Sequence, residues 1–353
     1  MIEKTDLQAS VSAGIITEAQ AASLKALSDQ RQGARNDLNP NDEPFELFRG
    51  FNEIFIVIGF AILTSGWIGV ITFFVLRSTN IQNSIFISAS IGGVIIWLLS
   101  EYFIKKRRMV APAITLSIMF TANSFYGLAG GLSEIFMVFQ GDNSSLVLPL
   151  LLATITMLIY WFRFKVPLVL AIVAILSFAV AILIAAHTNE APDSIRDLFL
   201  LSANGPFALI TLIIGVIVFI IAMLFDMSDP HRVTRRAANG FWLHVVAAPA
   251  LVNTVALTLL KPESILSNCL LIIVMICFAV IAIVIDRRSF LIAAIGYIVV
   301  LSATVFDDGN KFFIVLFLGA FLLFLGARWE IIRARLLQFL PKFIPKNRLP
   351  PPI

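Results

Sequence analysis

Charged residues and cysteine are scarce in this chain of 353 residues. Charged residues make up 14% of it, whereas 59% is hydrophobic and the mean hydropathy is +0.93. Because the apolar share of a water-soluble domain is about 45–50%, this composition excludes a soluble globular protein. The two cysteines, Cys269 and Cys277, are about 12 Å apart along one expected helix at its rise of about 1.5 Å per residue, which excludes a disulfide between them.

Patterns of catalytic, metal-binding and nucleic-acid-binding residues are also lacking. The three histidines, His187, His231 and His244, do not have the spacing of metal ligands. No glycine loop of a phosphate site follows a strand pattern, and no Ser or Cys has an evident base. The formal charge of +4 comes from the segments between apolar runs and forms no patch for nucleic acid. We therefore expect a non-enzymatic protein without cofactor or metal, although sites assembled from distant segments escape such patterns.

Long uncharged apolar runs dominate the chain after residue 50. Runs of about 20 such residues are typical of transmembrane helices, because only a helix satisfies its own backbone hydrogen bonds in lipid. The sequence thus predicts an all-α bundle of about ten helices in a lipid bilayer, spanning residues 51–327. The ten expected spans are 52–76, 84–104, 110–133, 145–162, 166–186, 206–225, 238–260, 265–285, 289–306 and 312–327.

The distribution of Lys and Arg predicts the orientation of this bundle. Short cytoplasmic segments retain positive charge. All but four of the 26 Lys and Arg lie before the first span or after an even-numbered span. The four exceptions are Arg77, Arg196, Lys261 and Lys311. Both termini are therefore expected in the cytoplasm, and the polar first fifty residues do not resemble a cleaved signal.

Residues 1–31 predict a short helical hairpin on the cytoplasmic side. Thr17 is a favourable N-cap, and Gln20 three residues later completes a capping box. Apolar residues then recur at helical spacing and form one face, and Gly14 suits a turn before it. We expect residues 5–31 to bind a protein partner or to mediate self-association.

Two further segments flank the bundle. Residues 32–50, rich in Asn, Asp and Pro, are typical of a flexible linker. Residues 328–353 form a basic amphipathic tail, in which Arg and Lys alternate with Trp, Ile, Leu and Phe. Such a tail is expected to lie along the cytoplasmic surface, with residues 328–348 against anionic lipid.

Several spans close in a similar way. AMLFD at 222–226 and AIVID at 282–286 each end a span with an aspartate followed by basic residues. These two segments are 60 residues apart. The segments LLSEYFIKKRR near 101 and YWFRFKV near 163 continue a similar spacing, although the second lacks the acid. One interpretation is a tandem array of helical hairpins in the same orientation. The alternative is that any bundle with short loops repeats at about this interval.

Polar groups inside the spans suggest one candidate site. No Lys, Arg, Asp or Glu lies near the middle of a span, which argues against an ion-driven carrier. In the seventh span, small residues on the face of His244 predict close packing and a hydrogen bond across the contact. Pro249 frees a backbone carbonyl that Asn253 could help to satisfy.

The third span supplies the rest of this candidate site, Asn123 and Glu134. Its glycines favour either a break, with residues 127–139 re-entrant, or close helix packing, and the sequence leaves both open. A site between spans three and seven would use Asn123, Glu134, His244 and Asn253.

Carboxylates at the cytoplasmic span ends form a second candidate region. Glu101, Asp226 and Asp286 each lie beside Arg or Lys, which favours structural ion pairs. The densest cluster is also a candidate interaction surface. It consists of Asp226, Asp229, Arg232, Arg235 and Arg236.

Some segments carry a family resemblance. GIITEAQAASLKAL resembles the hairpin that opens bacterial multi-span proteins of the DUF2157 type, and it is similar to the short SHOCT oligomerisation module. FDMSDPHRVTRRAANGFWLHVVAAPALVN, AIVIDRRSFLIAAIGY and GARWEIIRARLLQFLP resemble other segments of such proteins, whereas residues 80–205 show no resemblance. The resemblance implies a bacterial inner membrane and brings no catalytic residues.

Three functions are compatible with this sequence. The first is a non-enzymatic membrane component with a cytoplasmic docking or oligomerisation hairpin. The alternative is a small-solute transporter or exporter with its site between spans three and seven, and an intramembrane enzyme is a third possibility.

Overall fold

The computed structural model describes most of residues 52–287 and shorter parts on either side. The described residues are 9–17, 20–21, 24, 52–134, 138, 143–189, 192, 194–203, 205–230, 232, 234–261, 264–287, 316, 319–320, 323–339, 341 and 349–350. Within these ranges the chain is helical and contains no strand. The predicted linker, the ninth span and most of the tenth, the segment after residue 134 that was a candidate for a re-entrant turn, and most of the tail beyond 339 lie outside them.

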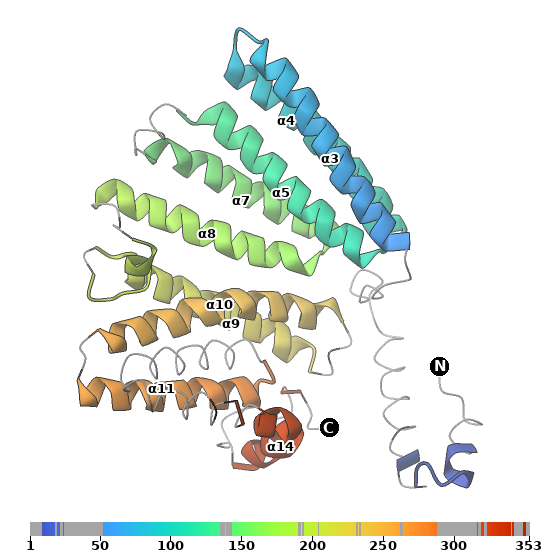
Figure 1. The fold of residues 1–353 in the computed structure, drawn as a ribbon, viewed down its shortest axis with the longest axis vertical. Coiled ribbons are helices and arrows are strands. Elements are labelled where there is room, and N and C mark those ends of the chain that lie inside the picture. Colours follow the sequence, from blue (N-terminus) through green and yellow to red (C-terminus); the bar gives the residue numbers. More distant parts are fainter. Residues whose placement is uncertain are drawn as a thin grey trace.

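The helices pack side by side in a row that follows the chain nearly in order (Figure 1). The row begins with α3 and α4, continues through α5, α7 and α8 to α9 and α10, and ends with α11 and α14. The bounds are α3 Asn52–Leu76, α4 Ile81–Ser100, α5 Val110–Leu132, α7 Val147–Phe164, α8 Pro167–Thr188, α9 Phe207–Ser228, α10 Arg235–Leu260, α11 Ile265–Val284 and α14 Trp329–Phe339. A π-helical turn, Glu101–Lys106, continues α4, and short 3₁₀ helices occupy Ser144–Leu146 and Ile195–Leu198.

Seven of these helices are long and apolar enough to cross a membrane, so the chain is a multi-pass helical membrane protein. They are α3, α4 with its π-helical turn, α7, α8, α9, α10 and α11, which correspond to the first, second and fourth to eighth predicted spans. Large apolar side chains such as Phe74 and Leu266 are exposed, as lipid contact requires. The predicted count of ten is thus supported for seven helices.

The third predicted span, α5, forms a helix of 23 residues but is not among the seven. Its composition is less apolar because it contains Pro112, Asn123 and several glycines. The helix packs against α3, α4 and α7, and Leu116 and Phe120 are buried there. The polar residues of this span therefore lie on a helix that is surrounded by other helices. At the start of α5, the side chain of Glu53 in α3 accepts a hydrogen bond from the Ala111 backbone N–H at 3.2 Å.

Local signals explain where the helices begin and end. Asn80, Thr234 and Ser264 are N-caps whose side chains accept backbone hydrogen bonds in the first turns of α4, α10 and α11. Between α7 and α8, Lys165 adopts a left-handed conformation and Pro167 begins the next helix. Only two residues are then needed to reverse the chain.

Among the residues that the structure describes, four turns share this left-handed geometry at a residue other than glycine. Arg108, Lys165, Arg232 and Asp286 have φ of 53°, 53°, 53° and 55°. Each follows one of the helices α4, α7, α9 and α11, at the right-hand end of the row (Figure 1). Because such residues are uncommon, four similar turns at successive hairpins favour the interpretation as a tandem array over the alternative.

Contacts between successive hairpins repeat as well. Near the end of α4, Ser100 bonds Tyr160 of α7 at 2.8 Å and Glu101 accepts from Arg163, over separations of 60 and 62 residues. At the end of α9, Asp226 pairs with Arg287 after α11 over 61 residues. The segment YWFRFKV, at the end of α7, has no acid that could continue this series of contacts to the next hairpin. We therefore distinguish an N-terminal half, α3–α8, from a C-terminal half, α9–α14.

Candidate functional site

The seventh predicted span, α10, is the most enclosed of the seven candidate membrane helices. Half of its most apolar stretch is buried (50%), against 11% for α3. Ala247 and Ala248 are fully buried on the face that also carries His244. The small residues of this face let α9 approach closely, as the sequence predicts.

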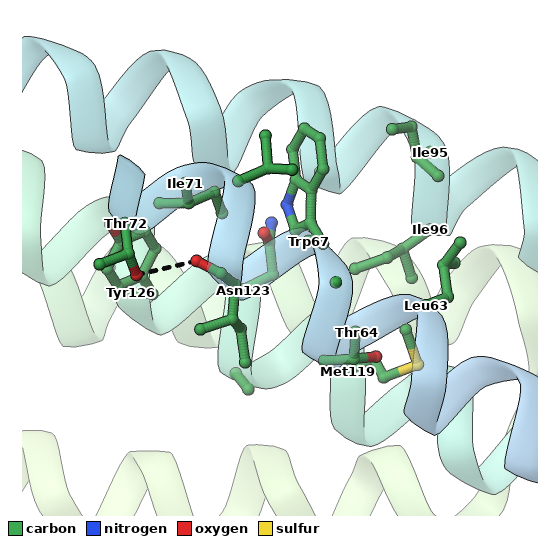
Figure 2. Close-up of a pocket in the computed structure, with 15 residues that line it drawn as sticks. Leu63, Thr64, Trp67, Ile71, Thr72, Ile95, Ile96, Met119, Asn123 and Tyr126 are labelled. Atoms are coloured by element: carbon green, nitrogen blue, oxygen red, sulfur yellow. Dashed lines mark hydrogen bonds between the residues drawn. The ribbon is translucent and has the colours of Figure 1, made fainter. Parts of the chain in front are cut away.

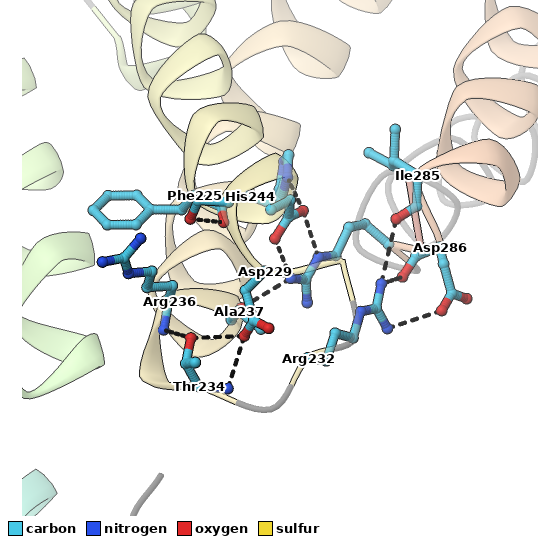
Figure 3. A network of polar contacts seen from close by, with 12 residues as sticks. Phe225, Asp229, Arg232, Thr234, Arg236, Ala237, His244, Ile285 and Asp286 are labelled. Atoms are coloured by element: carbon cyan, nitrogen blue, oxygen red, sulfur yellow. Dashed lines mark hydrogen bonds and ion pairs between the residues drawn. The ribbon is translucent and has the colours of Figure 1, made fainter. Parts of the chain in front are cut away.

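A buried carboxylate, Asp226, lies between α9 and α10 near the end of α9. Asp226 Oδ2 is 3.0 Å from His244 Nε2, so the predicted hydrogen bond of His244 across the helix contact is confirmed. Arg287 donates from Nε to Asp226 Oδ2 at 2.9 Å and from Nη2 to Oδ1, while Nη2 also donates to the Ala237 carbonyl at 2.8 Å. Figure 3 shows how these groups join α9, α10 and the turn after α11.

Glycine makes this arrangement possible. A Cβ atom at Gly240 would overlap with Asp226 Oδ1 and lie 3.2 Å from the Ala222 carbonyl oxygen. Ala222 itself is fully buried on α9. The absence of a side chain at position 240 therefore lets the carboxylate sit between the two helices.

The buried carboxylate is occupied on both oxygens. Two donors reach Oδ2 and one reaches Oδ1, and Asp226 is only 5% exposed. Since a carboxylate accepts but does not donate, the proton of the contact with His244 lies on Nε2. A substrate could bind this carboxylate only by displacing one of these donors. The arrangement therefore suits a structural contact that joins α9, α10 and the turn after α11.

A second ion pair lies beside the first and nearer to solvent. Arg232 pairs with Asp286 at 2.8 Å and also donates to the Asp286 carbonyl at 2.9 Å. Trp329, at the start of α14, donates from Nε1 to Asp286 Oδ1 at 2.8 Å. Burial, with the nearby charge of Arg287, lowers the pKa of Arg232. Asp286 therefore attaches the tail helix to the end of α11.

The charged cluster predicted as an interaction surface is mostly turned inward. Asp226, Asp229 and Arg235 are buried, and Asp229 accepts from the backbone N–H and hydroxyl of Thr234 at 2.8 and 2.7 Å. Only Arg232 and Arg236 of the five predicted residues are exposed. The physical reason is that Asp229 holds the start of α10 and Asp226 pairs with a residue that is distant in sequence.

The four residues predicted to share a membrane site lie apart. Asn123 belongs to α5 and His244 to α10, and α7 and α8 lie between these helices (Figure 1). Glu134 is exposed beyond the end of α5. Asn253 is half-buried on α10 and makes no side-chain hydrogen bond to the described residues. These side chains therefore do not form one site between spans three and seven.

Asn123 instead borders a cavity of about 650 Å³ between α3, α4 and α5 (Figure 2). Its Nδ2 donates to the Ala89 carbonyl at 2.8 Å. Trp67 of α3 lies on the same wall, and its indole N–H is buried. Neither Trp67 nor Arg287 was among the residues predicted to form a site. The spacing of about 60 residues from Asp226 was a signal for Arg287, whereas no pattern marks Trp67.

Comparisons with known proteins do not assign these sites. Models of protein families, curated proteins and solved structures give no match to this chain. Among the described residues, no group of three His, Cys, Asp or Glu is placed to hold a metal ion. Function must therefore be argued from the geometry above.

Proposed function

We propose that this protein is a non-enzymatic component of the bacterial inner membrane, with about ten spans and both termini in the cytoplasm, that self-associates through residues 5–31. In this proposal it belongs among multi-span proteins of the DUF2157 type. The transmembrane row is a fixed support, and the N-terminal hairpin supplies the contact with a second copy.

The observation that carries the proposal is the exposure of apolar side chains in the described part of the N-terminal segment. Thr17 N–H donates to Gln20 Oε1 at 2.9 Å and Gln20 N–H to Thr17 Oγ1 at 3.3 Å, the reciprocal bonds of a capping box. Gly14 has φ +70°, which favours glycine at this turn. Ile15 and Leu24 nevertheless remain 75% and 41% exposed. Contact with another chain would remove this apolar surface from water.

The choice of a second copy as the partner follows from the similarity of this segment to the SHOCT oligomerisation module. The choice of a non-enzymatic role follows from Asp226, whose oxygens are engaged by His244 and Arg287. A solute carrier is less favoured, since α7 and α8 separate Asn123 from His244.

The test uses two full-length copies with different tags, coexpressed and extracted in a mild detergent. Capture of one tag should recover the other from the wild type. Deletion of residues 1–45 and Ile15→Asp should each abolish recovery, because the first removes the contact and the second places a charge in it. Ala13→Asp is the matched control, since Ala13 is also exposed and the added charge is the same.

Three results would overturn the proposal. One is a wild type in which the second tag is never recovered. Another is recovery that persists without residues 1–45, which would place self-association in another part of the chain. Recovery of a different protein in place of the second copy would likewise contradict self-association.

A further inference from the structure

The cavity between α3, α4 and α5 has the size and lining of a ligand site. Its volume of about 650 Å³ lies within the range of about 300–1,000 Å³ that is usual for small-molecule pockets. The wall is almost entirely apolar and includes no charged residue. A charged ligand would therefore have no counter-ion among the lining residues.

A hydrogen-bond donor and an acceptor converge on one corner of this cavity. Trp67 Nε1 is buried and has no hydrogen-bond partner among the described residues. Asn123 uses Nδ2 to bond Ala89, which leaves Oδ1 without a hydrogen bond to the part of the chain that the structure describes. A Cβ atom placed on Gly92 would lie 2.6 Å from Asn123 Oδ1 and 2.9 Å from Trp67 Nε1, so both atoms face the space beside Gly92.

The cavity is accessible from the lipid side of the row. Leu63 and Ile68 of α3 and Ile95 of α4 line it and are 50%, 58% and 38% exposed. Since α3 is the least enclosed of the seven candidate spans, little protein covers this side. Figure 2 shows Trp67 and Asn123 on the inner wall, with apolar side chains around them.

We propose that this cavity binds a neutral lipid alcohol, a molecule with a single hydroxyl group and a long apolar chain. A hydroxyl both accepts and donates a hydrogen bond. It would accept from Trp67 Nε1 and donate to Asn123 Oδ1, while the chain fills the apolar part of the cavity. A hydrocarbon satisfies neither group, and an ether or a carbonyl oxygen satisfies only Trp67. This inference is independent of self-association through residues 5–31.

The experiment measures saturable binding of tritiated dodecanol to the purified full-length protein in detergent, with dodecyl methyl ether and dodecane as competitors. Dodecanol should displace the probe most strongly, the ether less and dodecane least. Trp67→Phe keeps an aromatic ring but removes the N–H, and it should weaken dodecanol binding about tenfold, as expected for one hydrogen bond. Gly92→Ala places a methyl group against both Trp67 Nε1 and Asn123 Oδ1, so it should abolish binding.

Gly69→Ala is the matched control. Gly69 lies on the same helix as Trp67 but does not line the cavity, and nothing lies within 4 Å of the added Cβ, so wild-type binding should be retained. Thermal unfolding of each variant shows whether the fold is kept. The proposal fails if the wild type shows no saturable binding, if dodecane competes as well as dodecanol, or if folded Trp67→Phe binds dodecanol with wild-type affinity.

Discussion

Both halves of the row join successive hairpins through a carboxylate and an arginine about 60 residues apart, but in different surroundings. In the N-terminal half, the side chains of Glu101 and Arg163 are 31% and 47% exposed. In the C-terminal half, those of Asp226 and Arg287 are 6% and 8% exposed, and His244 adds a third partner. The two pairs therefore have similar spacing and similar two-point contacts, yet one lies near solvent and the other lies inside the protein.

The difference follows from the side chains beside each pair. Near Glu101 the interior is filled by aromatic rings: Tyr160 stacks on Phe120 at 4.6 Å between ring centroids, and Trp97 contacts Tyr160 and Phe164 at 5.9 and 5.0 Å. This packing leaves the ion pair at the edge. Near Asp226, small residues on α9 and α10 let the helices close around the carboxylate. The N-terminal half thus packs aromatic rings beside its ion pair, whereas the C-terminal half buries its ion pair between helices.

The largest effect is expected from breaking the buried pair. Arg287→Met leaves Asp226 buried without its arginine, and removal of one partner of such a pair costs about 3–5 kcal/mol. We expect this loss in the free energy of unfolding, measured by SDS titration of the purified protein in mixed micelles.

The double variant Asp226→Leu with Arg287→Met provides the control. Replacing both partners by apolar residues removes the unpaired buried charge, so the double variant should be more stable than Arg287→Met alone. Equal losses in the single and double variants would mean that the pairing of these charges is not what stabilises this half.

A smaller loss is expected when the helix contact is altered without removing a charge. In Gly240→Ala the new methyl group overlaps with Asp226 Oδ1, and overpacking of this kind costs about 1–3 kcal/mol. Gly69→Ala on α3 is the comparison, since nothing lies within 4 Å of its added Cβ. The same SDS titration should place Gly69→Ala at or above wild-type stability, and a similar loss in both variants would show that steric overlap is not the cause.

Sequence periodicity and composition predicted much of this architecture. Seven expected spans coincide with candidate membrane helices, because each needs only a long apolar run and recognisable ends. The contact of His244 with a neighbouring helix was also predictable, since small residues on its face indicate close packing. The capping box of Thr17 and Gln20 forms as expected because its partners are three residues apart.

Partners that are distant in sequence were not predictable in the same way. Asp226 lies near several arginines in the sequence, yet it pairs with Arg287, and Asp229 turns to Thr234. Burial of these carboxylates depends on which helix covers them, and composition does not contain that information. Trp67 is similar, because its buried N–H becomes notable only when α3, α4 and α5 enclose a cavity.

The smallest effect is expected at the exposed pair. Glu101→Gln or Arg163→Met should each cost at most about 1 kcal/mol, since solvent screens the interaction and already hydrates both groups. A double-mutant cycle with these two changes, measured by the same titration, should therefore give a coupling energy well below that of the Asp226 and Arg287 cycle. High salt should reduce it further, because exposed charges are screened more than buried ones. A coupling energy as large as that of the buried pair would contradict this expectation, because the exposure of the two charges would then not determine how strongly they interact.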